Sequence, residues 1–180
     1  PPSPIEWNIT MVGAPDVWTN YGVTGTGIVV SEIDTGTQWD HPALMNQYRG
    51  WNGSSADHNY NWFDPYEQSP DVPADTQGHG THVMGTMVGD DGDRHQVGMA
   101  PGAQWISCKG GDDVSGYLLT DELLQCADWI LAPSDLEGNN PDPSMRPHVV
   151  NNSWGGGSND YWFTGVIDAW QAAGIFPMFS

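Results

Sequence analysis

The stretch VVSEIDTGTQWDHPAL, residues 29–44, decides the fold class of this chain. Its first residues are mainly apolar and β-branched, as in a buried strand, and the run stops at Asp34, which a Thr-Gly turn follows. Similar apolar runs of strand length occur at residues 103–108, 148–154 and 175–179. The sequence therefore predicts a set of short buried strands, the first of which ends in a carboxylate.

Longer segments with helical spacing of apolar residues lie between these runs, at 79–89, 120–132 and 159–174. The last segment starts with a capping candidate, Asn159 or Asp160, and ends at Gly174, a plausible helix stop. Strands that alternate with helices indicate an α/β fold with a mostly parallel sheet and helices on both faces. Ligands bind beyond the carboxyl ends of such strands, which is where Asp34 lies, although Asp is also common there as a turn residue.

The composition excludes several classes of partner. The chain has 4 Lys and Arg against 23 Asp and Glu, a formal net charge of -19. Such a surface repels phosphate groups, so we expect neither nucleic acid nor a membrane surface as a partner. No apolar run approaches the roughly 20 residues that span a bilayer. At 180 residues, the chain has the size of one domain or a large part of one.

A second motif, TQGHGTHVMGTMVG, places His79 between two glycines at the start of a predicted helix. Gly78 and Gly80 would let another backbone or a substrate approach the imidazole closely. An imidazole transfers protons near neutral pH and needs an acceptor on its second ring nitrogen, and Asp34 could be that acceptor. A third motif, VVNNSWGGG, ends a predicted strand at Ser153, where the backbone could pair with an extended peptide.

Together these stretches resemble the subtilisin-like serine proteases. The family's aspartate motif corresponds to IDTG with the later HP, its histidine motif to HGTHVMGT, its core-strand lead-in to VGMAPGA and its substrate-binding segment to NNSWGG, in the family's order. The longer runs DTGTQWDHPAL, APGAQWI and VVNNSWGGGS are most similar to the bacillopeptidase F branch. The resemblance implies that residues 1–180 are the N-terminal portion of a single catalytic domain, so the predicted α/β fold is incomplete here.

The resemblance also implies roles for individual residues. Asp34 would orient and stabilise the imidazolium, and His79 would be the general base that takes a proton from a serine. His82 is expected to pack or bond within the fold, because the mechanism needs one imidazole. The predicted substrate-binding residues are Ser153, Trp154 and Gly155 on one side of the specificity pocket and, by a looser match in DDVSGY, Ser115 and Gly116 on the other.

The family's nucleophile motif, Gly-Thr-Ser-Met-Ala, does not occur among these 180 residues. The chain stops at GIFPMFS, where the family continues with Ala-Gly-Asn, whose asparagine contributes to the oxyanion hole. We therefore expect a secreted serine endopeptidase that acts on proteins or peptides, with the serine and this asparagine in a further C-terminal portion. The alternative is a catalytically inactive module that only binds peptides.

The sequence does not decide whether the protein binds a metal ion. The expected chemistry needs no cofactor, but a structural calcium ion is conceivable in the loop GDDGDRHQ, which offers Asp90, Asp91 and Asp93. Ala43 replaces an aspartate that many relatives use for calcium. A metalloprotease site with His79, His82 and Asp34 is disfavoured, since no His-Glu-x-x-His pattern is present.

The two cysteines, Cys108 at the end of a predicted strand and Cys126 on the following predicted helix, form either a disulfide or two buried thiols. The spacing alone does not distinguish these possibilities.

Overall fold

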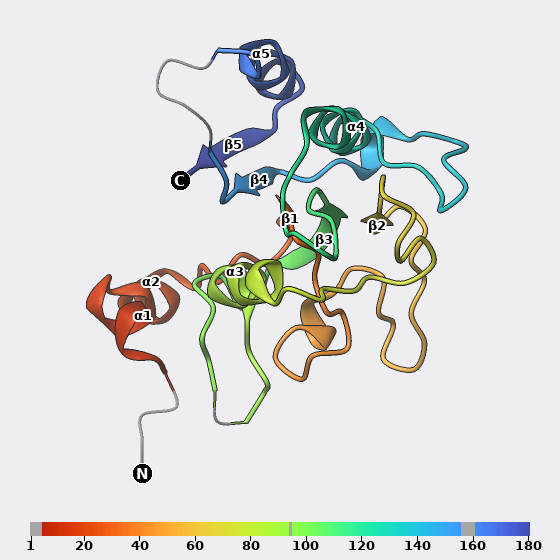
Figure 1. Ribbon diagram of the computed structural model, residues 1–180. Helices are drawn as coiled ribbons and strands as arrows, with labels where there is room; N and C mark the ends of the chain where they lie inside the picture. The colour runs from red at the N-terminus through yellow and green to blue at the C-terminus, as the bar shows by residue number, and fades with distance from the viewer. Residues whose placement is uncertain (1–4, 94, 156–160) are drawn as a thin grey trace.

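The computed structural model of the chain describes residues 5–93, 95–155 and 161–180. Its centre is a parallel sheet of five strands in the order β2-β3-β1-β4-β5, so the strand that ends at Asp34 is the central one (Figure 1). The strands are β1 Val29–Asp34, β2 Trp62–Phe63, β3 Gln104–Lys109, β4 Val149–Asn152 and β5 Phe176–Phe179.

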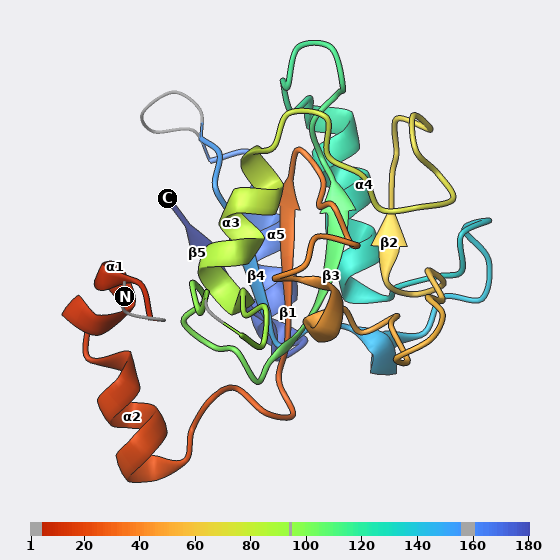
Figure 2. The same ribbon diagram turned by 90° about the horizontal axis from the view of Figure 1, so that it is seen from below.

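Helices cover both faces of this sheet. Figure 2 shows α3 (His79–Val88) in front of the strands and α4 (Thr120–Leu131) and α5 (Thr164–Ala172) behind them. The predicted α/β architecture, with a parallel sheet between layers of helices, is confirmed.

Each face of the sheet packs its own apolar core. On the α4 and α5 face, Ile33 of β1 belongs to a buried cluster that includes Ile130 of α4 and Trp170 of α5. On the α3 face, Val30 of β1 packs in a second cluster with Met84 of α3. Successive strand residues point to opposite faces, so one short strand supplies both cores.

Two helices near the N-terminus were not predicted, α1 (Trp7–Met11) and α2 (Ala14–Tyr21). Pro15 stands in the first turn of α2, and Gly22 ends it with a positive φ of 66°, so start and stop signals were readable. Backbone and indole hydrogen bonds tie this region to the segment after α3, from Glu6 N to the Gln96 carbonyl and from Trp18 Nε1 to the Met99 carbonyl. The edge strand β2 and two 3₁₀ turns, Met45–Gln47 and Pro143–Met145, were not predicted either.

The helix predicted at 159–174 begins later than expected. α5 starts at Thr164, and the capping candidates Asn159 and Asp160 lie outside the described residues. Its predicted stop is confirmed, since Gly174 follows the helix with a φ of 81°, a conformation that glycine adopts without strain.

The structure shows that the two cysteines are bridged rather than free. Cys108 of β3 and Cys126 of α4 form a disulfide with a Cα–Cα separation of 5.7 Å, and both residues are fully buried. The bridge fastens α4 to the sheet on the face opposite α3. Among the described residues, no helix has the length and apolar character needed to cross a membrane.

Candidate active site

Asp34 and His79 meet at the carboxyl end of the central strand. Nδ1 of His79 lies 2.7 Å from Oδ1 of Asp34, which confirms the predicted contact. The aspartate side chain is 2% exposed and that of the histidine 58%, so a buried carboxylate holds one edge of an accessible imidazole ring. With Nδ1 engaged by the carboxylate, Nε2 is the ring nitrogen left for proton exchange with a ligand.

Hydrogen bonds to both its side chain and its backbone hold Asp34 in place. Its Oδ1 also accepts a hydrogen bond from Thr35 N at 2.7 Å, so the turn role of this aspartate and its contact with His79 coexist. Its carbonyl oxygen accepts from Gly110 N at 2.7 Å and Gly111 N at 3.1 Å, directly after β3. Two contacts to the carboxylate and two to the backbone carbonyl therefore fix the position of Asp34.

His79 is the first residue of α3, and side chains from other segments satisfy the start of that helix. The N-cap residue, Gly78, has no side chain to cap the helix. Gly80 N donates to Thr35 Oγ1 at 3.0 Å, and Thr81 N donates to Asp75 Oδ2 at 2.8 Å. Because free N–H groups at a helix start need acceptors, these bonds fix the orientation from which His79 projects.

Asp75 is the centre of this support. Its Oδ1 accepts from Thr35 Oγ1 at 2.9 Å, Gln77 N at 3.1 Å and Gly78 N at 2.8 Å, and its Oδ2 accepts from Thr81 Oγ1 at 2.7 Å. The residue after Asp34 is thereby linked to the helix that carries His79. Sequence reasoning missed Asp75 and Thr35, although a helix that starts at glycine signals that some other group must act as its cap.

The glycines around His79 play different parts. A Cβ on Gly80 would lie 2.0 Å from the Gly36 carbonyl oxygen, so the predicted close approach of another backbone occurs at this position. Gly78 has open space around it and is needed for its positive φ of 82° instead.

The predicted substrate-binding segments face each other across a cavity of about 310 Å³. Gly116 lines it from one side, and Trp154 and Gly155, which follow β4, line it from the other. Ser115 and Ser153 are not among its lining residues: Ser115 bonds to Asp112 within its own loop, and Ser153 Oγ accepts from Asn151 Nδ2 at 2.7 Å. The remaining lining is mostly apolar and comprises Tyr117, Leu118, Thr120, Leu123 and Trp162.

Trp154 is fixed by its aromatic neighbours. Its ring stacks on Trp162 at 6.4 Å between centroids and meets Phe163 edge-on at 5.2 Å and Phe179 at 5.7 Å. Such pairs favour one ring orientation, so this wall of the cavity is preformed.

The loop that carries Gly116 is anchored by a buried lysine. Nζ of Lys109, at the end of β3, lies 2.6 Å from Asp113 Oδ1 and 2.9 Å from Gln68 Oε1. Its distance to Asp64 Oδ2 is 3.9 Å. The lysine thereby joins the end of β3 to two loops beside the site.

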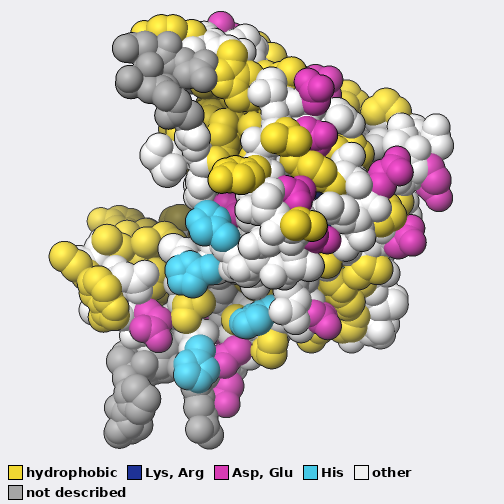
Figure 3. Space-filling view, in the orientation of Figure 1, with side chains coloured by type: hydrophobic (Ala, Val, Ile, Leu, Met, Phe, Trp, Pro, Cys, Tyr) yellow, Lys and Arg dark blue, Asp and Glu magenta, His cyan; other side chains and the backbone are white. Residues whose placement is uncertain are grey.

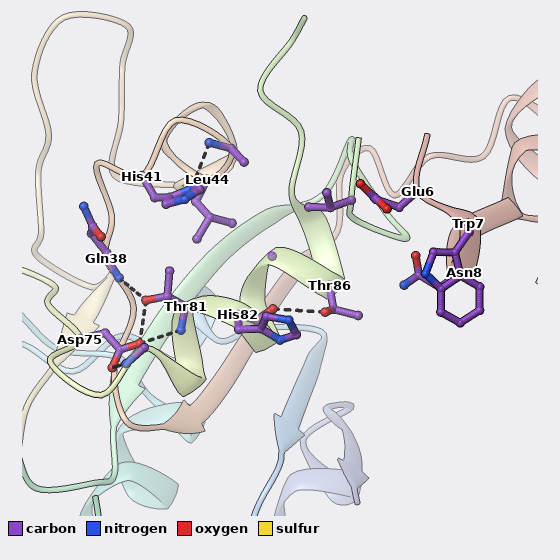
Figure 4. A pocket seen from close by; sticks show the side chains of 14 residues that line it. Glu6, Trp7, Asn8, Gln38, His41, Leu44, Asp75, Thr81, His82 and Thr86 are labelled. Carbon is purple, nitrogen blue, oxygen red and sulfur yellow. Dashed lines mark hydrogen bonds between the residues drawn. The ribbon is translucent and has the colours of Figure 1, made fainter. Parts of the chain in front are cut away.

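His82 does not pack within the fold, contrary to expectation. The buried side of α3 is formed by Gly80, Met84 and Val88, so His82 lies on the opposite, exposed side. There it lines a cavity of about 540 Å³ between α3 and α1, with Thr86 beside it and Trp7 opposite (Figure 4). Gln38, Thr81 and Asp75 close one end of this cavity through their hydrogen bonds.

The surface around these features is acidic. Figure 3 shows histidines below a group of exposed hydrophobic side chains, with Asp and Glu side chains around them and no Lys or Arg of the described residues in view. Lys109 is fully buried, and Arg49 is half-buried with hydrogen bonds to Asn61 and to the Met145 carbonyl.

Hydrogen bonds within the acidic loop after α3 engage one carboxylate oxygen each of Asp90 and Asp91. Asp90 Oδ1 accepts from Gly92 N at 2.8 Å, and Asp91 Oδ1 accepts from Asp93 N and His95 N at 2.9 and 3.0 Å. Across the described part of the chain, no group of three or more His, Cys, Asp or Glu side chains is arranged to hold a metal ion. A structural calcium ion in this loop stays a prediction.

Several known proteins are similar to this chain in sequence. The chain is 48% identical to bacillopeptidase F of Bacillus subtilis (strain 168) over 98% of its own length and 12% of that protein's length. It is 31% identical to the major intracellular serine protease of the same organism, over 84% of the chain and 41% of the relative. It is 32% identical to subtilisin BL of Lederbergia lenta, over 83% of the chain and 51% of the relative.

The chain thus spans between 12% and 51% of the length of these three relatives. Residues 25–180, which include every strand and the helices α3 to α5, match the subtilase family. The chain belongs to the subtilase family.

Proposed function

We propose that the protein containing this chain is a serine endopeptidase that hydrolyses peptide bonds through an Asp-His-Ser triad. The observation that carries the proposal is the 2.7 Å contact between the buried carboxylate of Asp34 and the exposed imidazole of His79. Family membership and the protease names of the relatives support it.

In this mechanism His79 Nε2 accepts the proton of a serine hydroxyl while the serine oxygen attacks the carbonyl carbon of the substrate. The imidazolium then gives that proton to the nitrogen of the leaving peptide, and the C–N bond breaks to leave an acyl-enzyme. A water molecule, deprotonated by the same imidazole, hydrolyses the ester. Asp34 remains ionised throughout, keeps the proton on Nδ1 and stabilises the imidazolium charge.

The nucleophile belongs to another part of the protein. Residues 1–180 would be the N-terminal portion of one catalytic domain, and the remainder would bring a serine to His79 and an asparagine amide to the oxyanion. The exposed side chains of Phe176, Met178 and Phe179 on the edge strand β5 support a further packing partner at this edge.

Substrates would be proteins or peptides in extended conformation. The backbone after β4 would pair with the substrate, and the cavity of about 310 Å³ would take one of its side chains. Because Leu118, Leu123 and Trp154 contribute to its walls, an apolar side chain suits it best.

We propose secretion for this protein. Disulfides persist in oxidising compartments, and the Cys108–Cys126 bridge fits an extracellular site. The names of relatives include both extracellular and intracellular proteases, so direct measurement of the protein in culture medium and in cells decides the point.

A fluorophosphonate probe tests the proposed function on the full-length protein, because such a probe labels only an activated serine. Wild-type protein should be labelled and should cleave an unfolded protein substrate. His79→Ala should lose both signals, with turnover lower by several orders of magnitude and an unchanged melting temperature. His82→Ala is the matched control on the same helix and should keep both.

A full-length protein that binds peptides but is neither labelled nor active would support the inactive peptide-binding module instead. Equal labelling of the wild type and the His79→Ala variant would refute the role of His79.

A further inference from the structure

Glu32 is a fully buried carboxyl group in the central strand, and the triad chemistry does not use it. It precedes Asp34 by two residues on β1, so both side chains point to the α3 face of the sheet. Its neighbours on the strand, Ser31 and Ile33, point to the opposite face.

The contacts of Glu32 place its carboxyl group beneath the first turn of α3. Oε1 accepts a hydrogen bond from Thr37 Oγ1 at 2.6 Å, and Thr37 Oγ1 lies 2.9 Å from Oγ of Ser107, the β3 residue paired with Glu32. A Cβ built on Gly80 would lie 3.0 Å from Oε1. The carboxyl group therefore touches the residue that follows His79.

Two buried oxygens near the candidate triad lack partners. Within the described parts of the chain, neither Oε2 of Glu32 nor Oδ2 of Asp34 has a hydrogen-bond partner. An ionised carboxylate that is fully buried with a single hydrogen bond is costly, whereas a protonated one becomes a donor. A protonated Glu32 could donate the hydrogen bond that Oδ2 of Asp34 lacks.

The negative charges near Glu32 favour its protonated form, as burial does. Asp34 on β1 and Asp75 from the segment before α3 are the carboxylates around it, and His79 is the titratable group on α3. Lys109 on β3 is engaged with Asp113. Burial, and then the charge of Asp34, raise the pKa of Glu32 well above its ordinary value.

We propose that Glu32 is a positioning residue for the Asp34–His79 pair, a neutral carboxyl group whose proton on Oε2 is available to Oδ2 of Asp34. The positioning role rests on the proposed peptidase function. A hydrogen bond to Asp34 disperses its negative charge, so the carboxylate attracts a proton on the imidazole less strongly. A negative charge on Glu32 would have the opposite effect.

The pH dependence of kcat/KM in the full-length protein tests this role, since its acidic limb reports the ionisation of the general base. Glu32→Gln is neutral and keeps a donor, so kcat/KM should stay within about threefold of wild type and the acidic limb should not move. Glu32→Val removes the donor, so the midpoint of the acidic limb should rise by about half a pH unit. A residue that only fills space would leave the limb in place in both variants.

An acidic limb that moves to lower pH in Glu32→Gln would show that Glu32 is charged and would overturn the proposal. An unmoved limb in Glu32→Val would also overturn it.

Infrared spectroscopy gives a second readout that needs neither activity nor the valine variant. The full-length wild type at neutral pH should show the C=O stretching band of a protonated carboxyl group, and Glu32→Gln should lack it. Glu137→Gln, which changes an exposed glutamate, is the matched control and should retain the band. A missing band in the wild type contradicts the inference about Glu32, whereas missing peptidase activity contradicts the proposed function.

Discussion

The two faces of the central sheet differ in what they bury. The face toward α4 and α5 holds an apolar cluster and the Cys108–Cys126 disulfide. The face toward α3 has an apolar cluster at one end and buries Glu32, Asp34 and Lys109 at the other. Buried ionisable groups cost free energy, so the concentration of these three on one face indicates that this face serves chemistry while the other serves stability.

Adjacent residues of β1 provide the sharpest test of this difference. Asp34→Asn should lower turnover of the full-length protein by about 10⁴-fold, because an amide that donates to Nδ1 stabilises the wrong imidazole tautomer. The fold should persist, since Gly110 N and Gly111 N still donate to the backbone carbonyl oxygen of residue 34. Steady-state kinetics and thermal unfolding of the same samples check both statements, and a large loss of melting temperature would contradict the division between the faces.

Ile33→Ala changes the neighbouring residue on the other face. Ile33 is fully buried in the cluster with α4, so the free energy of unfolding should fall by about 2–5 kcal/mol. Denaturant unfolding measures this loss. Well below the melting temperature, kcat/KM should stay close to that of the wild type, and a fall as large as that of Asp34→Asn would show that the faces are not separable.

Removing the disulfide, which lies on the same face as Ile33, should lower stability by a smaller amount. Replacing both Cys108 and Cys126 with alanine frees a loop with a sequence separation of 18 residues, which should cost about 3 kcal/mol of unfolding free energy. The same loss should appear when the wild type is unfolded in reductant, while the alanine variant should be insensitive to reductant. A variant as stable as the oxidised wild type would indicate that the bridge adds nothing to the packing of α4.

Glu32→Gln should leave stability almost unchanged at acidic pH and alter it only as pH rises. Because folding raises the pKa of Glu32, the folded chain binds this proton more tightly than the unfolded chain. The resulting stabilisation is complete below the ordinary pKa of 4.5 and is lost as pH rises toward the folded pKa. Across that window the wild type should lose about 1.4 kcal/mol per pH unit relative to Glu32→Gln.

Melting temperatures of both proteins from about pH 4 to pH 8 check this prediction. The curves should converge at the acidic end and separate with rising pH, with the glutamine variant the more stable. Parallel curves would mean that folding leaves the affinity of Glu32 for its proton unchanged.

The resemblance of short motifs to those of the subtilisin-like serine proteases was sufficient to identify Asp34 and His79 as a candidate pair. These motifs did not reveal Asp75, whose role depends on a helix start several residues away, or the exposed side of α3 on which His82 lies. Of the predicted substrate-binding residues, the structure gathers Gly116, Trp154 and Gly155 at one cavity and turns Ser115 and Ser153 to neighbours in their own segments.

The sequence by itself determined the alternation of strands and helices, the parallel sheet and the two residues of the candidate triad, since periodicity and local motifs are properties of short segments. Only the tertiary structure decided that Cys108 and Cys126 are bridged and that Glu32 is buried beside Asp34. Both outcomes depend on how helices dock on the sheet, α4 on one face and α3 on the other. A carboxyl group or a thiol in a strand acquires its chemistry from the helix that covers it, and that helix lies far away along the chain.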